Sequence, residues 1–223
     1  ALERAGRVLV HGVAAMPGKP TLLGTVGEAA FVGTPGYPVS AAVCCEEILR
    51  PLVAWLGRRE PDKRPGLRVE MARRSPSKLG LEEFLRLAIG KVGERYVAAP
   101  LGRGAGNITT LCRAQGVGRI PRSSEGVEQG ETLTAELFVP EETLERQLLV
   151  VGSHDNSLDV VADELMASDP SIRLSGSHVG SLGGIMALKE GLCHMAGMHL
   201  FDPETSDYNF PFIAEEMKQP PAV

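Results

Sequence analysis

The spacing of apolar residues changes along the chain, from alternation with polar residues in the middle to a mixture of helical and strand patterns at the end. This change limits the folds that the chain can adopt. Apolar and polar residues alternate in Leu67–Met71 and in Leu133–Leu137. Such alternation is typical of strands with one buried face. Three further short strand candidates, separated by glycine and proline, lie at 84–89, 95–98 and 117–120. About five short strands in roughly 75 residues predict a small β-barrel or β-sandwich.

After residue 140 the pattern changes to alternating helices and strands. We expect a helix from Glu141, strands at 148–151, 172–174 and 194–200, and helices at 158–166 and 182–190. This βαβαβ order predicts a parallel sheet with right-handed crossovers.

The first 57 residues predict the end of an α/β unit. Strands are expected at 7–13, 21–26 and 29–33, with a hairpin turn at Gly27-Glu28, and a helix is expected from Pro38 to Gly57. Pro51 should kink or divide this helix. Its buried stripe is predicted at Ala42, Cys45, Leu49, Leu52 and Leu56.

Charge is distributed unevenly along the chain. Residues 1–60 carry six basic and five acidic residues, 61–139 carry thirteen and nine, and 140–223 carry four and fourteen, giving net charges of +1, +4 and −10. The change near residue 140 suggests separate units, although chance segregation of solvated charge is an alternative. With the charged, proline-containing linker at 58–65, the predicted domains are 1–57, 62–139 and 140–223.

Composition excludes several classes of protein. Glycine and proline, 26 and 16 residues, interrupt every apolar run before it reaches the length of a membrane span. The first ten residues lack a signal-peptide pattern. The spacing of the four cysteines matches neither a metal site nor a disulfide framework, so we expect reduced thiols in a cytoplasmic protein. The acidic C-terminal third and the small number of aromatic residues argue against binding to nucleic acid or to an anionic membrane.

Two Pro-Gly loops in the first segment are candidates for an anion site. The first is Pro17-Gly18-Lys19-Pro20, and the second, residues 33–40, leads into the predicted helix. Glycine permits close approach of a ligand to the backbone, free N–H groups at a helix start favour an anion, and Lys19 adds a cation. The alternative is that both are tight turns and that Lys19 is a solvated side chain.

At this point the sequence resembles the MoeA family of molybdopterin molybdenumtransferases, which includes the E domain of gephyrin. The resemblance rests on the Pro-Gly-Lys-Pro loop, the segment Gly-Thr-Pro-Gly-Tyr-Pro-Val-Ser-Ala, and four barrel segments in order: residues 83–86, 104–111, 114–117 and 129–131. It covers roughly residues 1–139 and implies the C-terminal portion of such an enzyme.

The resemblance implies insertion of molybdenum from molybdate into adenylylated molybdopterin, with hydrolysis of the adenylate and a requirement for Mg²⁺. Lys19 and Arg86 would be the catalytic residues, with Arg86 facing the pterin site of a partner subunit in a homodimer. The residues implied to bind pterin and phosphate are Gly18, Thr34, Pro35, Gly36, Pro38, Ser40 and Asn107. By position alone, Arg86 could instead form a cross-strand ion pair, and Asn107 could cap a helix.

Two residues depart from the family pattern. Tyr37 replaces the usual asparagine, and Met16 stands where many relatives have a lysine. The resemblance also implies that the acidic Mg²⁺ ligands lie upstream of residue 1. We therefore expect a fragment that holds no metal ligands and does not catalyse the reaction by itself.

The last third contains two Gly-Ser segments at predicted helix starts. Ser153, His154 and Asp155 follow one strand, and Ser181 and Gly183 open the next helix, so hydroxyl and N–H groups are expected to converge on an oxyanion. The alternative is simple helix capping by Ser153, Asp155, Ser177 and Ser181. No nucleophile elbow accompanies His154 and Asp155, and the spacing of His178, His194 and His199 fits no zinc pattern.

This third resembles the periplasmic-binding-protein-like domain, similar to LysR substrate-binding domains, that is fused behind MoeA in some archaea and bacteria. The residues that carry the resemblance are 152–155, 180–184, 196–203 and 208–209. It implies the first part of one lobe and an oxyanion ligand such as molybdate or tungstate. A module that binds or senses an oxyanion without catalysis is therefore the alternative function.

Overall fold

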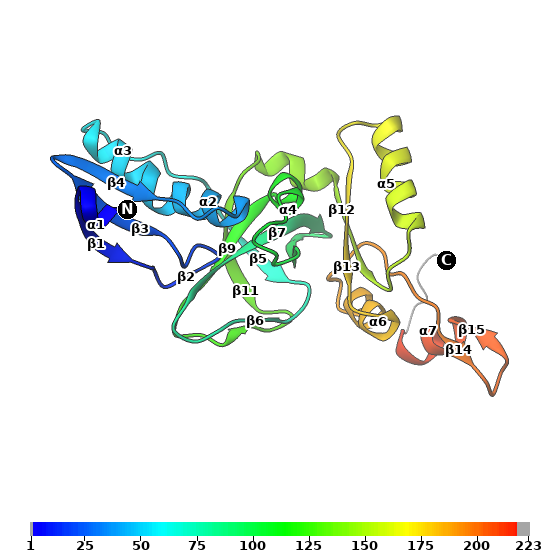
Figure 1. The fold of residues 1–223 in the computed structure, drawn as a ribbon. Coiled ribbons are helices and arrows are strands. Elements are labelled where there is room, and N and C mark those ends of the chain that lie inside the picture. Colours follow the sequence, from blue (N-terminus) through cyan, green and yellow to red (C-terminus); the bar gives the residue numbers. More distant parts are fainter. Residues whose placement is uncertain (1, 218–223) are drawn as a thin grey trace.

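The structure is a computed structural model that describes residues 2–217. Its three parts lie in a row (Figure 1). An N-terminal segment is followed by a β-barrel and then by a C-terminal lobe (Figure 1). The last six residues of the predicted lobe lie outside the described residues. The fold class, α/β elements on both sides of a barrel, is confirmed.

The N-terminal segment contains a small antiparallel sheet and a long helix. The short helix α1 (Leu2–Ala5) precedes the sheet, whose strands β1 (Arg7–His11), β3 (Leu22–Val26) and β4 (Ala29–Gly33) lie in the order β1-β3-β4. Val26 pairs with Ala29, so Gly27-Glu28 is the hairpin turn that the sequence predicts.

The long helix begins at Pro38 as predicted but has an irregular middle. It consists of α2 (Pro38–Cys44), the π-helical turn η1 (Cys45–Leu49) and α3 (Arg50–Leu56), and the π-turn ends two residues before Pro51. The predicted stripe is wrong: none of its five residues is buried, and the buried positions are Val39, Ser40, Cys44 and Ala54. A π-turn changes the face on which later side chains lie, so it affects only the positions that follow it. The first three buried residues precede it and are set by what packs on the start of the helix.

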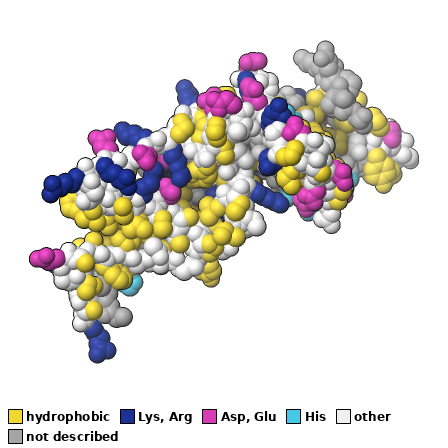
Figure 2. Space-filling model, turned by 90° about the horizontal axis from the view of Figure 1, so that it is seen from above, with side chains coloured by type: hydrophobic (Ala, Val, Ile, Leu, Met, Phe, Trp, Pro, Cys, Tyr) yellow, Lys and Arg dark blue, Asp and Glu magenta, His cyan; other side chains and the backbone are white. Residues whose placement is uncertain are grey.

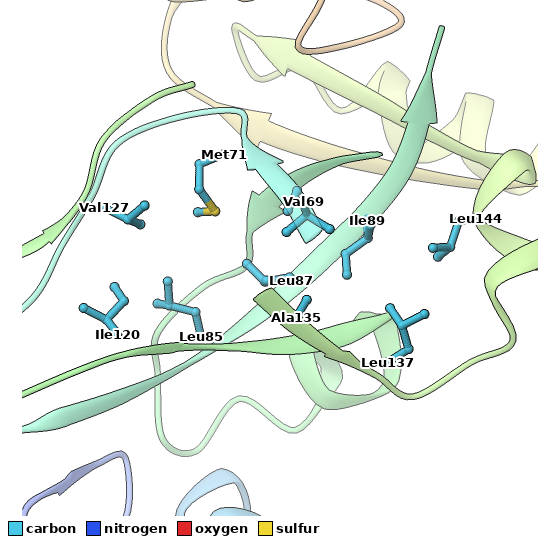
Figure 3. Packing of buried hydrophobic residues seen from close by; sticks show 11 residues of the cluster. Val69, Met71, Leu85, Leu87, Ile89, Ile120, Val127, Ala135, Leu137 and Leu144 are labelled. Atoms are coloured by element: carbon cyan, nitrogen blue, oxygen red, sulfur yellow. The ribbon is translucent and has the colours of Figure 1, made fainter. Parts of the chain in front are cut away.

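The barrel has five main strands. They are β5 (Gly66–Met71), β7 (Glu82–Val92), β8 (Arg95–Pro100), β9 (Gly116–Ile120) and β11 (Thr132–Leu137). The order β7-β8-β5-β11-β9 closes by pairing of β9 with β7, and only the β5–β8 pair is parallel. The pair β6 (Ser75–Pro76) and β10 (Gly126–Val127) extends one end, and α4 (Thr109–Arg113) precedes β9. Alternate side chains fill the interior, as Figure 3 shows for Leu85, Leu87 and Ile89 of β7.

Strand β7 is buried on both faces from Glu83 to Gly90. Its inner face belongs to the barrel core, whereas its outer face is covered by two different neighbours. Beside its first half lies the N-terminal segment: Val39 of α2 lines one pocket with Phe84 and Arg86, and β2 (Ala15–Met16) pairs with the edge of β7 in parallel. The lobe covers its second half so closely that a Cβ atom on Gly90 would lie 2.5 Å from the carbonyl oxygen of Gln147.

The lobe begins with the 3₁₀ turn η2 (Glu141–Arg146) and contains a two-stranded parallel sheet. Strand β12 (Gln147–Gly152) pairs with β13 (Arg173–His178), while α5 (Ser157–Ser168) and α6 (Ser181–Lys189) are the connecting helices. The predicted third strand at 194–200 is wrong in detail. This segment runs beside β12 but forms only one bridge, from Val150 to Met195. The Val151 and Ser153 N–H groups donate to the Met195 and Gly197 carbonyl oxygens, so the segment follows β12 without forming a regular strand. The elements β14 (Phe201–Asp202), β15 (Asp207–Tyr208) and α7 (Phe210–Glu216) follow.

The barrel and the lobe share buried cores across residue 140. Leu144 of η2 belongs to the barrel core. A second cluster joins barrel residues such as Ala88 and Val97 to lobe residues such as Leu149 and Val151. His194 adds a polar link, since its Nδ1 accepts a hydrogen bond from the Leu149 N–H and its Nε2 lies 2.9 Å from the Lys91 carbonyl oxygen. The change in net charge near residue 140 therefore does not coincide with a gap in packing.

The N-terminal segment leaves several large apolar side chains exposed. Figure 2 shows hydrophobic side chains over this part of the molecule, and Leu9, Trp55 and Leu56 are all more than half exposed. None of the helices within residues 2–217 has the length and hydropathy needed to cross a bilayer.

The four cysteines are free and differ in their surroundings. Cys193 is 3% exposed, and burial raises the pKa of its thiol to about 11, whereas Cys112 is exposed. At pH 8 roughly one Cys193 thiol in a thousand would be ionised. We expect iodoacetamide to label Cys112 of the native protein rapidly and to leave Cys193 unmodified, as measured by peptide mass spectrometry. Labelling of all four cysteines in guanidinium chloride is the control, and equal labelling rates in the native protein would contradict the prediction.

Candidate functional site

Strand β2 brings the first Pro-Gly loop to the barrel. Ala15 pairs with Glu82 and Met16 pairs with Glu83 at the start of β7. The following loop and the barrel enclose a cavity of about 60 Å³. Its lining residues come from the loop, from β7 and from the segment after β8: Met16, Pro17, Glu83, Phe84, Leu85, Arg86, Leu101 and Arg103.

Gly18 fixes the shape of this loop. Its φ of +126° lies in a region that favours glycine, and it is buried against the Val43 and Ala15 side chains. The Thr21 hydroxyl donates a hydrogen bond of 2.7 Å to the Gly18 carbonyl oxygen. Lys19, next in the chain, is exposed, so its ammonium group is available to an anion at the surface.

The second loop contacts a barrel loop at the start of α2. The Val39 N–H donates to the Ala105 carbonyl oxygen at 3.0 Å, and a Cβ atom on Gly106 would lie 3.5 Å from the Tyr37 ring. The first turn of α2 therefore uses one of its free N–H groups within the protein. Of the other predicted binding residues in this loop, Thr34 and Gly36 are exposed, Pro38 is half-buried, and Pro35 and Ser40 are buried.

Arg86 is buried by residues of its own chain. Only 4% of it is exposed, its Nη2 donates to the Gly102 carbonyl oxygen, and its Nε is buried without a partner. Burial lowers the pKa of Arg86, nearby Glu83 opposes this shift, and Arg103 adds to it. Among the described residues Arg86 has no carboxylate ion pair, so the alternative of a cross-strand pair is wrong.

Asn107 lies in the barrel loop that contacts α2. Its Oδ1 accepts a hydrogen bond from the Thr109 hydroxyl, and its carbonyl oxygen accepts from the N–H and the hydroxyl of Thr110. These contacts fix the start of α4, while the Asn107 side chain stays exposed beside the same loops. The structure thus brings the Lys19, Tyr37 and Asn107 loops to one end of the barrel.

Two charged residues of this site were missed by sequence reasoning. Glu83, 2% exposed, holds Arg103 through an ion pair of 2.9 Å between Glu83 Oε1 and Arg103 Nε. Arg103 also donates to the Ser75 hydroxyl and to the Pro76 carbonyl oxygen. The available signal for Glu83 was its place with Arg86 in the otherwise apolar stretch 83–90 of β7.

The lobe places its predicted oxyanion residues at the carboxyl ends of its strands. Ser153 Oγ and Ser181 Oγ lie 2.8 Å apart, and Ser181 Oγ accepts a hydrogen bond of 3.1 Å from the His199 N–H. Ser181 is the first residue of α6, and the N–H groups up to Gly183 precede the first helical hydrogen bond, from Gly184 to Gly180. These groups converge as the sequence predicts, although no ligand is needed to explain the contacts between them.

His154 and Asp155 have separate roles in the lobe. The His154 ring lies 4.2 Å from the His178 ring, centroid to centroid, in an edge-to-face arrangement. Asp155 Oδ1 accepts a hydrogen bond of 2.7 Å from the Ser157 N–H, and hydrogen bonds with Ser157 lower the pKa of Asp155. Asp155 therefore forms a local turn just before α5. The capping alternative is wrong for this helix, because its N-cap residue is Asn156 and makes no capping hydrogen bond with its side chain.

No group of three or more His, Cys, Asp or Glu side chains within residues 2–217 is arranged to hold a metal ion. The residues present therefore do not fit a Mg²⁺ site, and no chemical step in this chain is assigned to Mg²⁺.

Comparison with known proteins shows which family the barrel resembles. Residues 68–138 match the family model of the MoeA C-terminal region (domain IV). Residues 162–223 match the PBP superfamily domain, so the barrel and the lobe match two different family models.

Individual relatives agree with the MoeA assignment. A protein of Methanocaldococcus jannaschii, named for molybdopterin biosynthesis, is 30% identical over 137 residues, which are 61% of this chain and 31% of the relative. The molybdopterin molybdenumtransferase of Haemophilus influenzae is 29% identical over 140 residues, 61% of this chain and 35% of the relative. This chain thus spans about a third of the length of these relatives.

A solved structure shows the same fold. The crystal structure of the molybdopterin biosynthesis MoeA protein from Pyrococcus horikosii aligns with a TM-score of 0.50 and 31% identity. The alignment covers 62% of this chain and 34% of that chain. The resemblance noted in the sequence is confirmed at the level of the MoeA family.

Proposed function

We propose that the gene product containing this chain inserts molybdenum from molybdate into adenylylated molybdopterin, as a molybdopterin molybdenumtransferase. The observation that carries this proposal is the small cavity around Arg86, formed by the Pro-Gly-Lys-Pro loop, β7 and the segment after β8, in a chain whose residues 68–138 match the MoeA C-terminal region. We further propose a cytoplasmic homodimer, with adenylylated molybdopterin and molybdate as the substrates.

The chemistry of the substrates suits this site. Molybdate is a dianion and the pterin carries phosphate, so both need cations and backbone donors fixed in advance. Arg86 supplies a guanidinium with an unpartnered Nε, and Lys19 supplies an exposed ammonium on the Pro-Gly loop. Glu83 and the Gly102 carbonyl oxygen hold the two arginines in place, which reduces the reorganisation needed when the anion enters.

The two departures from the family pattern, Met16 and Tyr37, lie on the two Pro-Gly loops. Met16 lines the small cavity without contributing a charge, and Tyr37 presents a ring that is 66% exposed beside Gly106. An aromatic face at this position is suited to stacking against the flat pterin ring. We propose that the Mg²⁺ ligands belong to parts of the protein upstream of this sequence.

The test is reconstitution. The whole gene product, adenylylated molybdopterin, molybdate and Mg²⁺ should together form molybdenum cofactor, detected by activation of a cofactor-free molybdoenzyme. The 223-residue chain alone should form none. Absence of cofactor with the whole gene product, while an authentic MoeA enzyme succeeds in parallel, would overturn the proposal.

A second candidate function is oxyanion binding by the lobe without catalysis. The hydrogen-bonded Ser153 and Ser181 hydroxyls beside the start of α6 favour it. Molybdate, tungstate, sulfate and phosphate are the anions to titrate, and a Ser181→Ala variant should bind them more weakly. Equal affinity in this variant would count against the lobe site.

A further inference from the structure

Arg119 of β9 connects the barrel to the long helix. Its Nη1 and Nη2 atoms donate to the two carboxylate oxygens of Glu47 in η1, at 2.6 and 2.9 Å. Its Nε and Nη2 atoms also donate to Oε1 of Glu136 in β11, at 3.1 and 2.9 Å. The Arg119 Cζ atom lies 5.1 Å from the centre of the Phe84 ring of β7. One guanidinium therefore joins the helix to two further strands of the barrel.

The strand register puts Arg119 on the same face of the barrel as Arg86. Phe84 pairs with Arg119 and Arg86 pairs with Val117, and directly paired residues of antiparallel strands point to the same face. Val117 in turn pairs with Glu136. The residues that alternate with these in β7 fill the barrel core, so Arg119 and Arg86 share the outer face.

The long helix covers this outer face. A pocket of about 50 Å³ is lined by Val39 and Glu47 of the helix and by Phe84 and Arg86 of the barrel, among others. Val39 is fully buried, and its N–H donates to the Ala105 carbonyl oxygen. The helix is thus held to the barrel in its first turn, at Val39, and again about two turns later, at Glu47.

Arg119 is placed to act through its neighbours. Burial disfavours its charged form, but the hydrogen bonds and charges of Glu47 and then of Glu136 outweigh burial and raise the pKa of Arg119. Its donors are directed at these two carboxylates rather than at the cavity around Arg86, whose lining includes Phe84 but not Arg119. Its influence on the site therefore passes through Phe84 and through the helix.

We propose that Arg119 is a positioning residue for molybdenum insertion: its contacts with Glu47 and Glu136 fix the long helix, and the second Pro-Gly loop before it, against the barrel face that carries Arg86. The proposal deepens the proposed function and rests on the role of Arg86 in it. Without the second anchor the helix would be free to tilt about its first turn. Arg86 would then lose part of the cover that keeps it desolvated and oriented.

The test measures how well the helix covers Arg86 in the whole gene product. Phenylglyoxal modifies accessible arginine side chains, and peptide mass spectrometry gives the rate of modification at Arg86, which is 4% exposed. The variants are Arg119→Gln and Glu47→Gln. Arg95→Gln is the matched control, because Arg95 bonds both carboxylate oxygens of Glu70 and otherwise contacts the lobe rather than the helix.

We expect Arg86 to be modified about fivefold or more faster in Arg119→Gln and in Glu47→Gln than in wild type, because losing a charge-assisted hydrogen bond makes local opening more frequent. Arg95→Gln should match wild type. The double variant Arg119→Gln/Glu47→Gln should be modified no faster than Arg119→Gln alone, since the two residues act as one pair. Each faster variant should also form molybdenum cofactor more slowly in the reconstitution assay.

Arg119→Lys keeps the charge but not the planar fork that bonds two carboxylates at once. Its rate of modification at Arg86 should lie between those of wild type and Arg119→Gln, and it serves as the test if the glutamine variant does not fold.

The outcomes separate this proposal from the proposed function. Unchanged modification of Arg86 in the Arg119 and Glu47 variants would overturn the contact's role in holding the helix. Faster modification with undiminished cofactor formation would overturn its role in molybdenum insertion. Failure of the wild-type gene product to form cofactor would instead overturn the proposed function, and the rates at Arg86 would still decide whether Arg119 holds the helix.

Discussion

Replacing Leu149 with alanine is expected to lower the free energy of unfolding by about 2–5 kcal/mol. Leu149 is fully buried in the cluster that combines barrel and lobe side chains, and its loss leaves a cavity lined by both parts. Urea denaturation followed by circular dichroism measures the change. The expected size is large because neighbours on both sides are held by their own strands and cannot collapse into the space.

The distribution of the effect is as informative as its size. If one core stabilises both parts, hydrogen exchange should accelerate at Ile89 and Val97 in the barrel as well as at Val151 in the lobe. Leu79→Ala is the matched control, because Leu79 is 58% exposed and its loss should cost no more than about 0.5 kcal/mol. Faster exchange confined to the lobe would show that the two parts unfold independently.

Replacing Arg86 with alanine is expected to reduce molybdenum insertion by the whole gene product about a hundredfold or more. Arg86 is the buried guanidinium that lines the cavity beneath the Pro-Gly-Lys-Pro loop, and its Nε is free to donate to an anion. Arg86→Lys should retain part of the activity, since lysine keeps the charge but not the planar donor geometry. Lys19→Ala should lower activity less than Arg86→Ala, because Lys19 is exposed and its ammonium is screened by solvent.

Because Arg86 is buried, its removal could act through stability. Arg86→Met keeps most of the side-chain volume and the apolar packing, so it should be folded yet as inactive as the alanine variant. Arg68→Ala, on the exposed side of β5, controls for loss of a barrel cation and should leave cofactor formation unchanged. Full activity in a folded Arg86→Met variant would show that Arg86 does not bind the anion.

Local patterns predicted most of the elements. Alternation identified the strands of the barrel because one face of each strand meets the interior, and this signal needs only neighbouring residues. Pro38 and Gly57 marked the long helix in the same way, through their own backbone preferences. The buried stripe of that helix was wrong because burial at its start depends on a barrel loop: the Val39 N–H donates to the Ala105 carbonyl oxygen, a contact that the local sequence does not show.

The surroundings of the site residues could not be predicted in the same way. The sequence marked Lys19, Arg86 and Asn107 through resemblance to MoeA, but whether Arg86 faced solvent, a carboxylate or a loop depended on what covers the outer face of β7. Glu83 and Arg103 meet across the barrel end, twenty residues apart, and His194 meets the Lys91 carbonyl oxygen across the junction. Contacts of this kind follow from strand pairing and domain packing rather than from spacing in the chain.

The sequence by itself therefore determined the order of the parts, the barrel, the MoeA resemblance and the segregation of charge. Each of these depends on the identity of neighbouring residues or on motifs read in order. Only the tertiary structure decided that β7 is buried on both faces, that barrel and lobe share one core, and that the buried Nε of Arg86 has no hydrogen-bond partner among the described residues. The physical reason is that burial and electrostatic environment are set by residues distant in the chain, whose positions become known only when the strands are paired and packed.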